Sequence, residues 1–175
     1  MKTAQSTQTT QTTTRHRMRT ARAVAGVLAF DAVVHLYWAT GATWPAADAQ
    51  ALSLAVLGLE APFTPRVVIP LAALLLTGAG AVLAYARGRG GRAARLATGA
   101  VAAGLAVRGL AGLGWVAGLV GSPAGSPFYV LNLLLYTPVC LGLAWAAARL
   151  CFLSGVERNR PESSAGAARE TALHN

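Results

Sequence analysis

Two charged residues, Asp31 and Arg108, stand inside long apolar stretches of this 175-residue chain. A charge at the centre of a membrane helix costs about 2.5–3.5 kcal/mol on insertion scales, so each of the two requires a partner. His35 and Trp38 follow Asp31 at helical spacing, which places the three side chains on one face of a helix. We therefore predict a buried ion pair between Asp31 and Arg108, with His35 beside it.

A second polar stripe is formed by Asn132, Tyr136 and Cys140, which recur at every fourth residue. Pro138 interrupts it, and because proline has no backbone N–H, the carbonyl of Leu134 loses its helical partner and a kink is expected. The predicted polar cluster inside the membrane comprises Asp31, His35, Trp38, Arg108, Asn132 and Tyr136.

Gly104 and Gly112 lie about one helical turn before and after Arg108. Small residues in a membrane helix let a neighbouring backbone approach closely, so we expect a packed helix interface at this level.

The residue types in the cluster allow two interpretations. Polar side chains often join membrane helices by hydrogen bonds worth about 0.6 kcal/mol on average, and in that case the cluster is structural. Alternatively, Asp31, His35 and Arg108 line a path for a solute or a proton. A metal site of Asp31, His35 and Cys140 falls short of the usual four ligands, so we predict no metal site. We also predict no cofactor and no catalytic residue.

Enzyme signatures are missing from the sequence. A phosphate-binding Walker loop requires a lysine, and the only lysine is Lys2. Cys140 and Cys151 stand eleven residues apart in one expected helix, hence about 16 Å apart along its axis, which excludes a disulfide between them.

The basic residues show how the chain crosses a membrane. Thirteen of the fifteen lysines and arginines lie near the chain ends or in one mid-chain segment, with apolar stretches between these groups. They are Lys2, Arg15, Arg17, Arg19, Arg22, Arg87, Arg89, Arg92, Arg95, Arg149, Arg158, Arg160 and Arg169. Cytoplasmic loops are enriched in Lys and Arg, so the layout predicts four crossings of the cell membrane with both termini in the cytoplasm.

Composition agrees with a membrane protein. The chain is 54% hydrophobic and only 12% charged, whereas soluble domains average about 25% charged residues. The net charge of +9 comes from arginines that flank apolar runs, an arrangement unlike a nucleic-acid groove. We expect anionic lipid headgroups, attracted by about 1 kcal/mol per arginine, as the acidic partner and no nucleic acid.

The expected fold is an all-α, four-helix transmembrane bundle. Residues 21–154 form the membrane domain, with spans at 23–40, 67–86, 96–120 and 128–152, each close to the twenty residues that a bilayer requires. Residues 1–20 and 155–175 are polar and are predicted to be disordered cytoplasmic tails. Residues 46–59 are apolar enough for a short interfacial helix, and Thr64-Pro65 is typical of a helix start.

The segment 35–44, H-L-Y-W-A-T-G-A-T-W, resembles the H-x-Y-W-A-x-G-x-x-W signature of an uncharacterised family of small four-span bacterial integral membrane proteins. The resemblance extends over residues 23–152. It implies an arginine in the third span, matched by Arg108, and an F-x-x-x-D-x-x-x-Y-x-P-x-C pattern entering the fourth. Phe128, Tyr136, Pro138 and Cys140 match this pattern, but Asn132 stands where it has an acid, which weakens a proton relay there. The family implies no activity.

Three classes of function fit these observations. We favour a small membrane subunit or scaffold, because four helices without an internal repeat leave little room for alternating access in one chain. The alternatives are a small-solute or proton-coupled carrier and a membrane-embedded enzyme. The expected partners are membrane lipid and either a second copy of the chain or another membrane protein.

Overall fold

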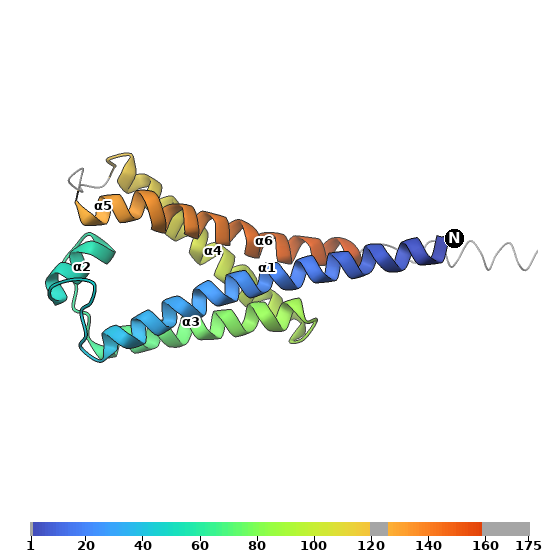
Figure 1. Cartoon of the computed structure of the whole chain (residues 1–175), viewed down its shortest axis with the longest axis horizontal. Coiled ribbons are helices and arrows are strands. Elements are labelled where there is room, and N and C mark those ends of the chain that lie inside the picture. Colours follow the sequence, from blue (N-terminus) through green and yellow to red (C-terminus); the bar gives the residue numbers. More distant parts are fainter. Residues whose placement is uncertain (1, 120–125, 159–175) are drawn as a thin grey trace, which may run out of the picture.

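A computed structural model describes residues 2–119 and 126–158 of the chain, with side chains described for 13–119 and 126–152. Within these residues all regular structure is helical (Figure 1). The elements are α1 (Lys2–Ala39), α2 (Ala49–Leu57), α3 (Pro65–Ala86), α4 (Gly91–Val116), α5 (Pro127–Leu131), the π-helix η1 (Asn132–Tyr136) and α6 (Thr137–Arg158). Elements α5, η1 and α6 follow one another without a break.

Four helical segments are long and apolar enough to cross a membrane, which confirms the predicted all-α four-helix fold. They are Thr13–Ala39, Pro65–Ala86, Gly91–Val116 and Pro127–Phe152. In each, only 22–28% of the most apolar window is buried inside the protein. The outward-facing side chains are large and apolar, as a lipid environment requires; they include Phe30, Val33, Leu74, Leu96, Val107, Leu134 and Trp145.

The first helix is longer than predicted. Residues 2–20, expected to be a disordered tail, form the beginning of α1. Once an apolar helix is nucleated, each further residue adds a hydrogen bond, so a polar segment can extend it. Arg17 also anchors this region, since its Nη2 donates to the carbonyl of Tyr85 at 2.7 Å and its guanidinium lies over the Tyr85 ring. Of the predicted tail 155–175, residues 159–175 lie outside the described part of the chain.

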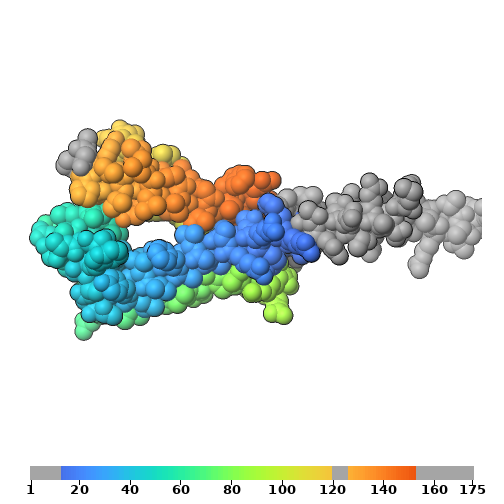
Figure 2. Space-filling view, viewed as in Figure 1, coloured from blue at the N-terminus to red at the C-terminus, as the bar shows by residue number. Residues whose placement is uncertain are grey.

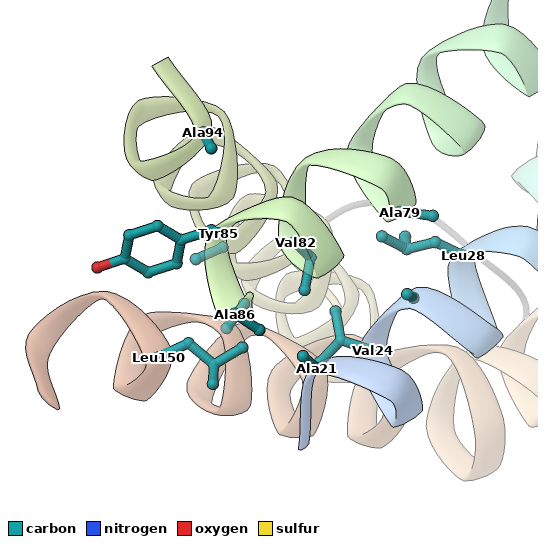
Figure 3. Close-up of a cluster of buried hydrophobic side chains, with 12 residues drawn as sticks. Ala21, Val24, Leu28, Ala79, Val82, Tyr85, Ala86, Ala94 and Leu150 are labelled. Carbon is teal, nitrogen blue, oxygen red and sulfur yellow. The ribbon is translucent and has the colours of Figure 1, made fainter. Parts of the chain in front are cut away.

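The four long helices form two pairs, α1 with α3 and α4 with α6 (Figure 1). The pairs meet at one end of the molecule and diverge toward the other. At the meeting end lies a core of mostly small side chains, in which Val24, Val82, Ala86 and Leu150 lie close together (Figure 3). Small residues let the helix backbones approach, so the bundle is closed at this end.

At the diverging end the short helix α2 lies against α5 (Figure 1). Asp48 caps α2 by accepting from the backbone N–H of Ala51 at 2.8 Å, and Gly58 ends the helix with a φ of 73°. A Cβ at Gly58 would lie 2.7 Å from the Phe128 ring, so this glycine permits both the turn and the contact. The helix predicted within 46–59 is thus present, and it bridges the two pairs.

The start of α3 is partly as expected. Pro65 occupies the first turn, where its missing N–H is harmless, and Thr64 is the N-cap residue. The Thr64 side chain, however, makes no capping hydrogen bond, contrary to the expectation that it would satisfy the free amides of the first turn.

Candidate functional site

Arg108 and Asn132 are the centre of a hydrogen-bonded network between α4 and η1. Arg108 Nη1 donates to Asn132 Oδ1 at 3.1 Å, and Asn132 Nδ2 donates to the carbonyl of Gly112 at 2.8 Å. Thr137 Oγ1 donates to the same Asn132 oxygen at 3.3 Å. Asn132 is fully buried. We call these four residues the Asn132 network; it satisfies both ends of the buried amide from within the protein.

The amide group of Asn132 suits this position because it accepts and donates at the same time. Its oxygen accepts from Arg108 and Thr137 while its nitrogen donates to Gly112. An ionised carboxylate only accepts, so an acid at this position would leave the Gly112 carbonyl without this donor. An amide at position 132 therefore fits this contact better than an acid would.

A π-turn brings Thr137 to Asn132. The backbone N–H of Thr137 donates to the carbonyl of Asn132, five residues earlier, which is the hydrogen bond of a π-helix. Pro138 follows directly, so the wide turn stands where we predicted a kink, at a residue that cannot donate. The predicted polar stripe did not include Thr137, because it assumed a spacing of four residues. Pro138, which disturbs a regular α-helix, was the feature of the sequence that could have indicated a wider turn here.

Close helix approach occurs at Gly112, as predicted, because a Cβ there would collide with the side chains of Thr137 and Asn132. Gly104, also predicted, has nothing within 4 Å of a Cβ and is exposed. The second close approach is at Gly109, where a Cβ would lie 2.6 Å from Leu141. The contact face of α4 therefore runs through Gly109 and Gly112.

Two aromatic rings enclose the guanidinium of Arg108. Its Cζ lies 5.5 Å from the centre of the Tyr136 ring and 5.8 Å from that of Trp115. Trp115 in turn packs edge-on against Phe128. Such contacts stabilise a cation by about 0.5–2 kcal/mol, the larger value applying where water is excluded. Arg108 is thus held by one amide and two rings.

Asp31 and His35 lie on the other helix pair. His35 Nδ1 is 3.3 Å from Asp31 Oδ1 and 2.8 Å from the Asp31 carbonyl oxygen. The Asp31 side chain is 50% exposed, whereas that of His35 is 12% exposed. The His35 ring is therefore packed into the protein, whereas the Asp31 carboxylate is half exposed.

The predicted direct ion pair between Asp31 and Arg108 is absent, because within the described residues the group within 4.0 Å of the Asp31 carboxylate is His35. The physical reason is the pairing of the helices: α1 packs along α3, and Asn132 turns Arg108 toward η1.

Trp38 positions the loop that follows α1. Its Nε1 donates to the carbonyl of Trp44 at 3.2 Å, and its ring packs edge-on against His35 and Phe63. Trp38 is almost completely buried. We therefore assign it a packing role, and the six residues of the predicted cluster divide into an α1 group, with Asp31, His35 and Trp38, and the Arg108 group.

The side chains offer few ligands for a metal. Among residues 13–119 and 126–152, no three His, Cys, Asp or Glu side chains come together. Cys140 and Cys151 are both free thiols and partly buried.

Neither the curated proteins nor the solved structures contain a match to this chain. A family model described as a protein of unknown function, DUF3995, matches residues 21–147. The match includes the four candidate spans almost completely, together with α2, Asp31, Arg108 and Asn132. Because it covers most of the chain, the protein belongs to the DUF3995 family.

Proposed function

We propose that this protein is a small scaffold or subunit of the cell membrane, crossing it four times with both termini in the cytoplasm. Basic residues of α1, of the turn between α3 and α4, of the first turn of α4 and of α6 support this orientation; they include Arg17, Arg22, Arg89, Arg92 and Arg149. Residues that neighbour these arginines in the sequence, namely Ala21, Ala86, Ala94 and Leu150, belong to the core at the end where the helix pairs meet (Figure 3). By the positive-inside rule this end faces the cytoplasm, and α2 lies at the outer surface.

The observation that carries the scaffold role is the closed Asn132 network. Its polar atoms bind one another across α4 and η1, with Asn132 fully buried. A catalytic or proton-relaying group must instead reach its substrate or the next group in the relay. The polar interactions of this network thus hold helices together, as a scaffold requires.

The orientation is tested with single cysteines in a background of Cys140→Ala and Cys151→Ala. We expect Glu60→Cys to react with a membrane-impermeant maleimide in intact cells, because α2 and its loop face outward. Arg89→Cys should react only after the cells are permeabilised. Labelling of Arg89→Cys in intact cells, with Glu60→Cys protected, would reverse the orientation.

A second candidate, a small-solute or proton-coupled carrier, is favoured by the half-exposed Asp31 beside His35. Asp31→Asn and Arg108→Ala separate the two functions. A scaffold predicts that Arg108→Ala lowers the amount of folded protein in the membrane, while Asp31→Asn changes it little. A carrier predicts that both variants accumulate normally and lose uptake of the solute.

The scaffold role also predicts a stable protein partner. Native mass spectrometry of the full chain in lipid nanodiscs should show a defined complex with a second copy or with another membrane protein. A monomer under all conditions, with the variants above losing uptake, would favour the carrier.

A further inference from the structure

Arginines gather at the closed end of the bundle, defined here as the end that holds the core around Val24 and Leu150. Figure 2 shows the beginning of α1 (blue), the region of the α3–α4 turn (green) and the end of α6 (orange) at this same end of the molecule. The arginines of these segments with described side chains are Arg15, Arg17, Arg19, Arg22, Arg87, Arg89, Arg92, Arg95 and Arg149.

No acid neutralises these arginines among residues 13–119 and 126–152. The acids in these two ranges are Asp31, Asp48 and Glu60, which all lie outside the segments just named, and the ion pair formed there joins Asp31 to His35. The remaining part of α6 carries one acid, Glu157. The closed end therefore keeps a large excess of positive charge, which attracts an anionic partner.

Tyr85 joins all four long helices at this end. Arg17 of α1 donates from Nη2 to the Tyr85 carbonyl at 2.7 Å, and its Cζ lies 5.1 Å from the centre of the Tyr85 ring. The Tyr85 hydroxyl donates to the carbonyl of Cys151 in α6 at 3.5 Å, and the Cys151 thiol donates to the carbonyl of Arg95 in α4 at 3.8 Å. Tyr85 thus lies between the start of α4 and the end of α6 (Figure 3). These contacts bring Arg17 and Arg95, from two different helices, to one place.

Arg17 is fixed by the protein but keeps donors that the protein does not satisfy. The Tyr85 carbonyl and ring hold its guanidinium, whereas its Nε is buried and has no acceptor among the described residues. A guanidinium carries five N–H donors in a planar fork that matches the oxygens of a phosphate. A side chain that is already held loses little freedom on binding, so Arg17 is well suited to hold a phosphate. Arg95 is exposed and can add a second charge.

We propose that the closed end binds the phosphate of an anionic phospholipid, with Arg17 and Arg95 as the principal contacts. Basic pockets between membrane helices are a common way of binding such headgroups. The inference goes beyond the scaffold role, and it does not depend on which side of the membrane this end faces. It also differs from a general attraction by charge, because it assigns the binding to two of the nine arginines.

A lipid fits this position better than a soluble anion. Leu96, which follows Arg95, is 73% exposed, and Phe152, which follows Cys151, is 75% exposed. Both belong to candidate membrane spans. Acyl chains can lie against these apolar side chains while the phosphate reaches the neighbouring arginines. A soluble anion gains nothing from the apolar surface.

The experiment is native mass spectrometry of the full-length protein with three probes: phosphatidylglycerol, phosphatidylethanolamine and inorganic phosphate. We expect phosphatidylglycerol to be retained and phosphatidylethanolamine, whose headgroup has no net charge, to be retained less. Inorganic phosphate, which has no acyl chains, should not be retained. Arg17→Gln and Arg95→Gln should each weaken the binding of phosphatidylglycerol by about fivefold, because each removes one positive charge beside the phosphate.

Arg19→Gln is the matched control, because it removes the same charge from the same helix. Two residues along an α-helix correspond to a rotation of about 200°, so Arg17 and Arg19 lie on nearly opposite faces of α1. We expect Arg19→Gln to leave the binding almost unchanged. Arg95→Gln keeps the proposal testable if Arg17→Gln disturbs the start of α1, since the Arg95 side chain is exposed and its contact with Cys151 is made by the backbone.

Two results would overturn the proposal. One is retention of phosphatidylethanolamine or inorganic phosphate as strong as that of phosphatidylglycerol. The other is an effect of Arg19→Gln as large as those of Arg17→Gln and Arg95→Gln, which would indicate attraction by the net charge without a defined site. The scaffold role is tested separately by complex formation, so either proposal can fail alone.

Discussion

Asn132→Ala is expected to lower the free energy of unfolding by about 2–4 kcal/mol, the largest loss among single polar substitutions in the membrane domain. Asn132 is completely buried, and its removal deprives Arg108, Thr137 and the Gly112 carbonyl of a partner. A buried polar group left unpaired loses more than the bond itself contributed. Reversible unfolding of the purified protein in mixed micelles measures the change.

Asn132→Asp separates the acceptor function of the Asn132 side chain from its donor function. A carboxylate keeps an acceptor for Arg108 and gains an ionic attraction, but it loses the donor to the Gly112 carbonyl. We therefore expect a loss smaller than that of Asn132→Ala. If Asn132→Ala has the same free energy of unfolding as the wild type, the Asn132 network contributes nothing to stability.

Gly112→Ala is expected to destabilise the protein by about 1–3 kcal/mol through overpacking. The added methyl group would collide with Thr137 and Asn132, so α4 and η1 must separate. Gly104→Ala is the matched control on the same helix, where the methyl group meets nothing within 4 Å.

Gly104→Ala should increase the stability of the protein, because replacing an unconstrained helical glycine by alanine stabilises a helix by up to about 1 kcal/mol. Thermal unfolding of both variants in the same detergent tests this contrast. Equal shifts for the two glycines would show that α4 and η1 do not approach closely at Gly112.

The sequence was sufficient to predict the four-helix fold. Residues 67–86 carry no charge and are long enough for a bilayer, and α3 occupies Pro65–Ala86. Gly112 was also identified correctly as a point of close helix approach, whereas Gly104, predicted on the same ground, makes no close contact. These features depend on length, local composition and helical spacing.

The partner of Arg108 could not be derived in the same way. Helical rise places Asp31 and Arg108 at similar depths, about 12 and 18 Å from the basic ends of their predicted spans, but depth does not specify which helices are neighbours. That choice follows from the packing of α1 with α3 and of α4 with α6. Long-range pairing of this kind depends on the whole bundle and has no local pattern in the sequence.

The π-turn at η1 is a second feature that the sequence did not predict. Counting in steps of four groups Asn132 with Tyr136 and Cys140, and it leaves out Thr137. The observed hydrogen bond from Thr137 to the Asn132 carbonyl spans five residues and brings the Thr137 hydroxyl to the Asn132 amide. A change of backbone register over one turn is decided by tertiary contacts, which periodicity does not contain.

The most direct test of the account is a pair of double-mutant cycles on unfolding free energy, one for Arg108 with Asn132 and one for Arg108 with Asp31, all changed to alanine. We predict a coupling of about 0.6–1.7 kcal/mol between Arg108 and Asn132, the range of membrane hydrogen bonds, and a clearly smaller one between Arg108 and Asp31. A stronger coupling of Arg108 to Asp31 than to Asn132 would contradict the network on which this account rests.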